Sequence, residues 1–568
     1  MTFYSRKRRA LLVITIIIVF LLIAFKWFLK PEKLGSSEAG SEVFFSKESG
    51  FYEDAFELEL SSDSGTVYYT LDGSVPNKNS IKYEKPISIS DASIQENVHS
   101  MRTDVSTGFE KEEIEKVSSE YPGYQVPDYK IDKATIVRAV VYDGYGNYSD
   151  IKTATYFVGF EQKKGYEGMR ILSVVTDPSN LFDYENGIYV TGKTYDEYVK
   201  EYRGSGEWYW REEFWGLWEA NYRNRGKEWE RKASCAFFDE TGILEHEQEC
   251  GIRVHGGLSR GYNPKSLNIY VREEYDGNKT FGKDLFGTGY DAAAVTLFQG
   301  GQDARTKAKD IIISSAVKDL DVATMNYVPY VLFLNGEYWG VYWLNEKYDA
   351  NFFEHYYGVN KDNVIMIKSG EPEVGEEEDY QYFEKMVEFC VNNDVTKEEN
   401  YQKVCDMIDM ESYIDYYAIM CYVGRCGDWP WLNYGTWRVK KTESGPYGDG
   451  KWRWVIFDLN SPGFRTELDT IQYVMENDAM FCNLMTNDTF RTQLVQRMEE
   501  LMETVFNYDT MSEWLDEYSE FMEEPMSVNS KRFYGDDSSA VFYNEIDGLK
   551  NFFRVRKEYL IPILDKYR

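Results

Sequence analysis

The stretch GDWPWLNYGTWRVKKTESGPYGDGKWRWVIFDLN, residues 427–460, decides how this chain is interpreted. Its middle is rich in Gly, Pro, Ser and Asp, which favour a turn, and residues typical of strands flank it on both sides. It therefore predicts a β-hairpin in which Lys441 lies opposite Lys451. In that register Asn433, before the outgoing strand, lies beside Asp458 at the end of the return strand.

Asp428 precedes Asn433 by five residues, so a carboxylate, a carboxamide and a second carboxylate are expected together at the open end of the hairpin. Asn433 and Asp458 would hold Mg²⁺ with its phosphates, and Asp428 could accept a proton from an attacking hydroxyl. Protein kinases carry a catalytic Asp, an Asn and a metal-binding Asp in the same order. Hairpin ends also carry Asp and Asn for turn chemistry alone, so a purely structural role stays open.

These motifs resemble the spore-coat-protein-H-like (CotH) kinase family. The resemblance covers about residues 165–568 and implies an atypical kinase fold, secreted or at the cell surface, that transfers phosphate from ATP to Ser or Thr hydroxyls. Several separate motifs carry it in the expected order. They are Asp428-Trp429-Pro430 with Asn433, Trp437-Arg438, the Trp452 to Asp458 run, and the upstream stretches 251–257, 264–267 and 334–349.

Two positions depart from the family pattern. Leu432 replaces the first Asn of the family's pair, and Asn460 replaces the second Asp after the hairpin. The missing charge at position 460 is expected to weaken metal binding without abolishing it, because Asp458 still supplies a carboxylate.

A kinase also needs a cation for the nucleotide phosphates, and no GxGxxG or GxxxxGK loop precedes the hairpin. Lys265, at the entry to a predicted strand, is the candidate cation for ATP. Glu346 is its candidate partner, by analogy with the Lys–Glu pair of ordinary kinases. Arg253, Arg260 and Lys368 are the next candidates, and a surface charge without a role is the alternative for each.

The N-terminus predicts a membrane anchor. A basic cluster at residues 6–9 precedes an apolar run at residues 10–25, which with the aromatic residues after it is about long enough to span a bilayer core. The basic cluster is expected to stay in the cytoplasm. We therefore predict a cytoplasmic tail and transmembrane helix in residues 1–30, a flexible linker at 31–43, and extracytoplasmic domains beyond it. A cleaved signal peptide is the alternative.

Residues 44–158 predict a small β-sandwich, because short alternating strands are separated by turn signals such as Asp72-Gly73. The run YYTLDGSVP at 68–76 resembles the chitobiase/β-hexosaminidase C-terminal-like domain, an immunoglobulin-like accessory module without catalytic residues. A polar insertion at 91–129 is expected to form a loop with a short helix around 111–119. The module is expected to act as a spacer, and a contact with cell-wall glycan stays open.

Residues 159–568 predict an atypical protein-kinase-like α/β domain with a helical C-terminal part, so the whole chain is α+β and multidomain. Asn335-Gly336 is a strong two-residue hairpin signal. A helix at 410–423 leads into the Asp428 loop. The C-terminal third reads as helical, with Pro525 separating two parts.

Composition narrows the function classes. A formal net charge of −33 argues against nucleic acid as a partner and fits either a well-solvated surface, which is the preferred interpretation, or a cationic partner such as a basic, exported protein substrate. Three functions compete: a Mg²⁺- or Mn²⁺-dependent Ser/Thr kinase, a catalytically weak kinase-fold surface protein with a structural or glycan-binding role, and a glycoside hydrolase. The hydrolase ranks last because the sequence contains no candidate acid/base pair of carboxylates.

Overall fold

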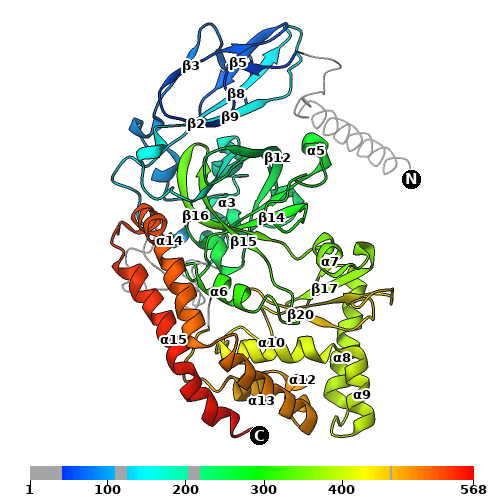
Figure 1. The fold of residues 1–568 in the computed structure, drawn as a ribbon. Coiled ribbons are helices and arrows are strands. Elements are labelled where there is room, and N and C mark those ends of the chain that lie inside the picture. The colour runs from blue at the N-terminus through cyan, green and yellow to red at the C-terminus, as the bar shows by residue number, and fades with distance from the viewer. Residues whose placement is uncertain (1–40, 109–123, 203–217, 461–462) are drawn as a thin grey trace, which may run out of the picture. The chain divides into compact units, whose positions relative to one another are not determined.

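The computed structural model describes residues 41–108, 124–202, 218–460 and 463–568, and it divides into two compact units (Figure 1). The smaller unit comprises residues up to Glu48 together with 56–89 and 137–154. The larger unit comprises 49–55, 90–136 and 155–568. The short helix expected around 111–119 lies outside the described residues.

The smaller unit is built from short antiparallel strands. Strand β5 pairs with β6 on one side and β8 on the other, with Tyr69 opposite both Ile81 and Ala139. Buried apolar residues such as Val67 and Val140 form its core. This arrangement fits the predicted β-sandwich. The strands are β1 Phe44–Phe45, β3 Phe56–Leu58, β4 Leu60–Ser61, β5 Thr66–Thr70, β6 Ile81–Lys82, β7 Ile87–Ile89, β8 Thr135–Tyr142 and β9 Lys152–Val158, of which the ends of β8 and β9 belong to the larger unit.

A closed seven-stranded barrel forms the first half of the larger unit. Neighbouring strands pair antiparallel except β10 and β15, which run parallel and close the barrel. The predicted turn is confirmed, since Asn335 and Gly336 both adopt positive φ between β15 and β16. In order around the barrel the strands are β10 Arg170–Val175, β11 Arg231–Phe238, β12 Leu244–Val254, β13 Leu267–Tyr270, β14 Ala294–Phe298, β16 Glu337–Glu346 and β15 Tyr327–Leu334.

Strand alternation divides the barrel residues between two cores. Leu172 and Val174 of β10 belong to one buried cluster with Leu332 of β15, whereas Ile171 and Val331 belong to the other. Because successive side chains of a strand point to opposite faces, one cluster fills the barrel and the other packs outside it. The outer cluster continues into the helices, so barrel and helices share a core.

Part of the N-terminal polar insertion packs on the barrel. Glu337, at the start of β16, is buried and accepts the backbone N–H groups of Val98 and Ser100 at 2.6 and 2.7 Å. A buried carboxylate needs such donors to offset its lost hydration. These bonds explain why residues 90–136 belong to the larger unit.

A second sheet in the larger unit holds the hairpin that follows the Asp428 loop. Its order is β18-β17-β19-β20, and all its pairs are antiparallel. The predicted hairpin is confirmed, but its register differs: Trp437 pairs with Arg453, whereas the predicted register places it opposite Val455. A shift of two residues keeps every side chain on its expected face. The strands are β17 Val364–Lys368, β18 Glu371–Val374, β19 Gly435–Val439 and β20 Arg453–Val455.

Helices make up the rest of the larger unit, and α10 is buried along nearly its whole length because β20 and α13 contact it (Figure 1). The prediction that Pro525 separates two helices is wrong, since this residue lies inside the long helix α14, which packs beside α15. The α-helices are α2 Pro178–Phe182, α3 Gly192–Tyr202, α5 Glu273–Asp276, α6 Lys309–Ala316, α7 Ala350–Tyr357, α8 Tyr380–Asn392, α9 Glu398–Met407, α10 Met410–Tyr422, α11 Thr470–Asn477, α12 Ala479–Leu484, α13 Asp488–Glu503, α14 Tyr508–Tyr534 and α15 Ala540–Leu564.

The predicted fold class needs one correction. Across the four described ranges, no helix combines the length and the apolar character that crossing a bilayer requires. The fold that is described is therefore a β-sandwich unit and a mixed α/β unit without a transmembrane helix. The segment for which that helix was predicted, residues 1–30, lies outside the described residues.

Candidate active site

The loop between α10 and β19 carries Asp428 and is held in place from both sides. Trp429 is fully buried, and its indole N–H donates to the Tyr416 hydroxyl of α10 at 2.9 Å. From the other side, the Tyr473 hydroxyl lies 3.0 Å from the carbonyl oxygens of both Gly427 and Trp429. The loop thus has a fixed backbone on which a catalytic side chain can be oriented.

The three residues predicted at the hairpin end gather around one buried guanidinium. The Asn433 amide donates to Asp428 Oδ2 at 2.7 Å. Arg425 lies 3.1 Å from Asp428 Oδ1 and 3.8 Å from Asp458 Oδ2, with a side chain only 1% exposed. The two carboxylates are 40% and 36% exposed, so both can meet a ligand from solvent. Arg425 had no distinguishing signal in the sequence, although it lies three residues before Asp428.

Burial raises the pKa of the Asp428 carboxyl. The charge of Arg425 opposes this rise, and the negative charge of Asp458 adds to it. A raised pKa makes a carboxylate a better proton acceptor, which suits a general base. Asn433 and Asp458 both adopt left-handed backbone conformations, with φ of 53° and 58°. Non-glycine residues rarely do so, and they concentrate at functional sites.

A further carboxylate, Asp310 of α6, lies beside this group. It accepts the backbone N–H of Leu459 at 2.5 Å and the Asn460 amide at 3.0 Å. The same amide donates to Asp458 Oδ1 at 3.0 Å. Burial, with the charge of Asp458, raises the pKa of Asp310 to about 7. The sequence offered no signal for Asp310, because only the tertiary fold brings α6 to the end of the hairpin.

The structure places Lys265 in the interior rather than beside the Asp428 loop. Its ammonium donates to the carbonyl oxygens of Arg260 and Tyr262 at 2.6 and 3.0 Å, and it lies 3.7 Å from the centre of the Tyr222 ring. Burial lowers the pKa of Lys265 well below its ordinary value. These contacts satisfy the lysine within the protein and tie the segment before β13 to the preceding loop.

Glu346 and Lys265 are not brought together. At the end of β16, the Glu346 carboxylate accepts the backbone N–H and the side-chain amide of Asn326 at 2.8 and 3.0 Å, and the Tyr356 hydroxyl. Burial raises the pKa of Glu346. Each residue has its own set of partners, and their assignment to ATP stays a prediction.

Two of the next candidate cations also have protein partners. Arg253 lies 4.2 Å from the centre of the Tyr270 ring and 3.5 Å from the Glu230 carboxylate. Arg260 is buried and donates to the Gly256 carbonyl at 2.7 Å, and burial lowers its pKa to about 9.

Lys368, the remaining candidate, lies close to the predicted metal ligand. It ends β17, and its ammonium lies 4.5 Å from the centre of the Phe457 ring, one residue before Asp458. Burial lowers the pKa of Lys368, and the charges of Glu373 and Asp458 oppose that effect. Lys347, the residue after Glu346 in the sequence, forms an ion pair with Glu373 at 2.6 Å. Lys368 therefore faces the Asp458 side of the site, and Lys347, which follows β16, lies near Lys368 through their shared neighbour Glu373.

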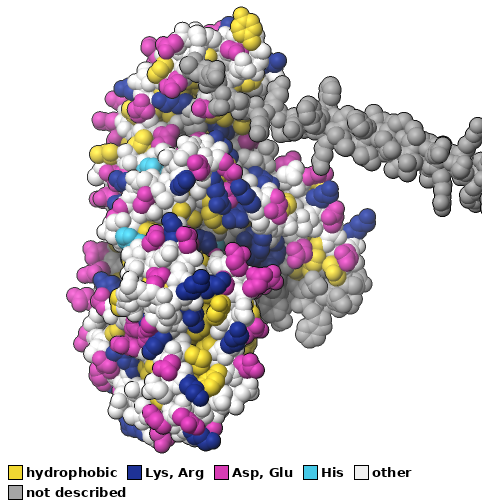
Figure 2. All heavy atoms as spheres, turned by 90° about the vertical axis from the view of Figure 1, so that its right-hand side faces the viewer, with side chains coloured by type: hydrophobic (Ala, Val, Ile, Leu, Met, Phe, Trp, Pro, Cys, Tyr) yellow, Lys and Arg dark blue, Asp and Glu magenta, His cyan; other side chains and the backbone are white. Residues whose placement is uncertain are grey.

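These lysines are part of a cationic region made by distant segments. Burial lowers the pKa of His255 well below its ordinary value, and Lys368, Arg260, Lys347 and Arg225 lower it further. Figure 2 shows Lys and Arg side chains gathered on one face of the larger unit. Like charges so close together favour an anionic ligand, since its negative charge relieves their mutual repulsion.

The arrangement fits a magnesium ion bound together with phosphates. Within the described residues, no three His, Cys, Asp or Glu side chains form a cluster that could hold a metal. Asp458 offers a partly exposed carboxylate, and Asn433 offers its amide oxygen, since its nitrogen faces Asp428. Mg²⁺ at nucleotide sites takes one or two protein ligands and completes its shell with phosphate and water, which agrees with this sparse set.

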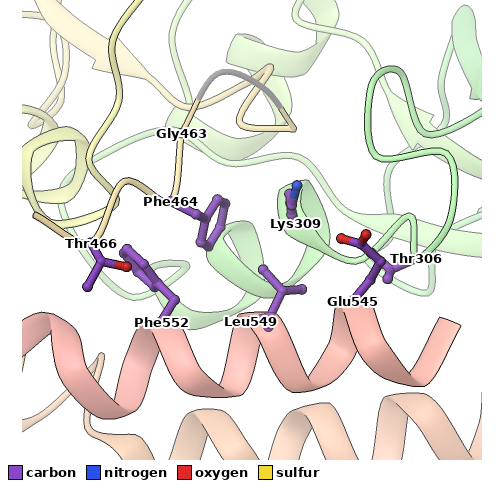
Figure 3. A pocket seen from close by; sticks show the side chains of 9 residues that line it. Thr306, Lys309, Gly463, Phe464, Thr466, Glu545, Leu549 and Phe552 are labelled. Atoms are coloured by element: carbon purple, nitrogen blue, oxygen red, sulfur yellow. The ribbon is translucent and has the colours of Figure 1, made fainter. Parts of the chain in front are cut away.

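A separate pocket of about 200 Å³ lies beyond Asp458, and none of the predicted site residues lines it (Figure 3). Its walls come from the start of α6, the segment 463–466 and the face of α15 that carries Leu549 and Phe552. The lining residues are Thr306, Lys309, Gly463, Phe464, Thr466, Glu545, Gly548, Leu549 and Phe552. The candidate active site is thus defined by converging side chains rather than by this pocket.

Comparison with known protein families assigns both units. Residues 252–560 match the family described as CotH kinase protein, and residues 56–156 match the one described as Fn3 associated. No curated protein matches the chain. The first match spans more than half of the 568 residues and includes Asp428, Asn433 and Asp458. The barrel strands from the end of β12 onward, the second sheet and the fixed Asp428 loop therefore lie in a kinase-like domain, and the chain is a member of the CotH kinase family.

Proposed function

We propose that the chain is an atypical protein kinase that transfers the γ-phosphate of ATP to a Ser or Thr hydroxyl of a protein. The observation that carries this proposal is the convergence of Asp428, Asn433 and Asp458 around the buried Arg425. Their order along the chain is that of the catalytic Asp, the Asn and the metal-binding Asp of protein kinases.

Asp428 acts as the general base in this proposal. Its carboxylate accepts the proton of the attacking hydroxyl, the hydroxyl oxygen bonds to the γ-phosphorus, and the bond to the bridging oxygen breaks to release ADP. The Asn433 amide and the Arg425 guanidinium orient the carboxylate through opposite oxygens. Arg425 also approaches Asp458. It therefore holds the proposed base and the proposed metal ligand at a fixed distance from each other.

Asp458 and Asn433 would hold Mg²⁺ or Mn²⁺. The metal, when bound, neutralises charge on the phosphates and so stabilises the transition state. Lys368 and Lys347 would meet phosphate oxygens as point charges, the role that lysine fills at many phosphate sites. The place of Lys368 beside Asp458 supports this role better than the interior position of Lys265 supports the one predicted for it.

The acceptor is proposed to be a basic protein. The chain carries 96 acidic against 63 basic side chains, and such an excess attracts cationic partners. Exposed Glu371 lies opposite Lys368 in the sheet, two residues beyond Ser369, whose hydroxyl accepts the Asn433 backbone N–H at 3.0 Å. Negative charge is therefore present near the loop where the acceptor would bind.

The test is transfer of label from γ-labelled ATP by the purified full-length protein, with Mg²⁺, with Mn²⁺ and with EDTA. Mass spectrometry of the labelled protein should place the phosphate on Ser or Thr. Metal-dependent labelling is expected, and EDTA should abolish it. No turnover of ATP with either metal, in protein that is folded by circular dichroism, would refute the proposal and favour a kinase fold with a binding role.

A further inference from the structure

We propose that Asp310 is a positioning residue for Asp458 and that it acts through the Asn460 amide, so that this chain requires Asn rather than Asp at position 460. The inference rests on the proposed function in one respect, which is that Asp458 holds the metal. The family pattern predicts that Asn460 weakens metal binding because it lacks the negative charge of Asp. We infer the opposite, that Asn460 supports the metal ligand.

Asn460 uses both ends of its amide. Its nitrogen donates to Asp310 Oδ2 and to Asp458 Oδ1, each at 3.0 Å. Its oxygen accepts the backbone N–H of Gln302 at 3.0 Å. Asn460 and Asp310 are 4% and 3% exposed, so solvent cannot replace these bonds easily. A side chain at this position must therefore donate toward two carboxylates and accept from one backbone group.

An ionised aspartate cannot meet that requirement, and a protonated one has a single donor for two carboxylates. An ionised carboxylate only accepts hydrogen bonds, so Asn460→Asp would set its lone pairs against those of Asp310 and Asp458. Like charges at this distance in a buried place are strongly unfavourable. The side chain also has little room to turn away, because a Cβ atom on Gly301 would lie 2.6 Å from Asn460 Oδ1.

Asp310 is rigid enough to position its partners. It lies in the first turn of α6, and the Asp303 carboxylate fixes the start of that helix by accepting the backbone N–H groups of Ala308 and Lys309 at 2.8 and 2.9 Å. Asp310 then holds the Leu459 N–H and the Asn460 amide on either side of one carboxylate. These two hydrogen bonds hold the residues after Asp458 in place. Asp458 itself has a left-handed backbone conformation, which is unfavourable for a non-glycine residue and needs such support.

The experiment compares the full-length native protein with Asn460→Asp, Asp310→Asn and the double variant. Asn460→Asp should raise the Mg²⁺ concentration for half-maximal ATP turnover about tenfold or more, the range seen when outer partners of metal ligands are lost. In the double variant the amide at 310 can donate to the new carboxylate. It should therefore recover part of the loss, since the bond from residue 460 to Asp458 stays broken, whereas additive losses are expected of unrelated sites.

Asn487→Asp is the matched control. Asn487 is also buried and its amide donates at 2.7 Å to the Val395 carbonyl, away from the site. This control should lower the Tm without changing the Mg²⁺ dependence. Two results would overturn the proposal. One is an Asn460→Asp protein that needs no more Mg²⁺ than the native protein for half-maximal turnover. The other is a double variant that needs as much Mg²⁺ as Asn460→Asp alone.

A metal-free measurement separates this inference from the proposed function. The Tm of the four proteins in EDTA reports the pair without any reaction, and the double variant should be more stable than the sum of the single losses predicts. Absence of this coupling refutes the Asp310–Asn460 pair even if the protein is a kinase. Absence of ATP turnover in the native protein would refute the proposed kinase activity. The Tm values would still show whether Asp310 and Asn460 are energetically coupled.

Discussion

Replacing Asp428 with Asn should remove most of the phosphoryl-transfer rate. The substitution keeps the shape of the side chain but removes its ability to take a proton. General-base catalysis contributes about 10²- to 10⁴-fold, which corresponds to about 3–5 kcal/mol of transition-state stabilisation. The raised pKa of the Asp428 carboxyl suits this role, because proton affinity helps a base.

The same substitution should destabilise the fold without unfolding it. The Asp428 side chain is 40% exposed, which limits the contribution of its ion pair, but the partner Arg425 is 1% exposed and retains the Asp458 carboxylate at 3.8 Å. An Asn at this position can still accept the Asn433 amide, which now bonds to Asp428 Oδ2 at 2.7 Å. Affinity for ATP should also stay close to native, because a base acts mainly in the transition state.

Asp449→Asn provides a matched control. Asp449 is 36% exposed and pairs with Arg453, which is as buried as Arg425, but it lies in the turn of the hairpin away from the site. Turnover of γ-labelled ATP, the Tm and the Kd for ATP should be measured for native, Asp428→Asn and Asp449→Asn proteins. A rate within tenfold of native in folded Asp428→Asn, or equal losses in both variants, would refute the role of Asp428 as base.

Three further predictions concern metal, nucleotide and pH. Asp458→Asn should weaken Mg²⁺-dependent ATP binding more than Asn433→Ala does in calorimetric titrations, because a carboxylate holds a hard cation better than an amide; the opposite order would place the metal elsewhere. Lys368→Ala should raise the Kd for ATP about tenfold, the effect of one lost charged hydrogen bond of roughly 1.4 kcal/mol, and an unchanged Kd would exclude it from the phosphate site. Burial and the charge of Asp409 raise the pKa of Asp321 from about 3.8 to about 6. Between these two pH values the folded protein keeps a proton on Asp321 that the unfolded chain releases. The free energy of unfolding therefore falls as pH rises from about 4 to about 6. The Tm of Asp321→Asn relative to native should therefore increase from pH 4 to pH 6, and a constant difference would contradict the shift.

Local patterns in the sequence were enough to predict the hairpins. Asn335-Gly336 is confirmed as the turn between β15 and β16, since both residues adopt the positive φ that such a turn requires. The second hairpin was predicted with a register shifted by two residues, because its long turn does not determine which residues lie opposite each other. The error left Asp428, Asn433 and Asp458 together, since two of them share one loop and the third lies three residues after the adjoining strand β20.

Long-range partners could not be predicted in the same way. The sequence predicts Lys265 as the cation for the ATP phosphates, and in the structure carbonyl oxygens and an aromatic ring surround it in the interior. Whether a lysine is buried or open depends on which loops fold over it, and no local pattern records that. Pro525 was likewise expected to end a helix, but tertiary packing of α14 against α15 outweighs the hydrogen bond that proline removes.

The sequence by itself determined the chemistry of the site: which residue can accept a proton, which can ligate a hard cation, and in what order they follow one another. Only the tertiary structure decided how these groups are held. It buries Arg425 between two carboxylates, brings Asp310 from α6 to the end of the hairpin, and turns Asn460 into a donor between two acids. The physical reason is that residue type sets the available protons and charges, whereas burial and long-range contacts set their energies, and both of these exist only in the folded chain.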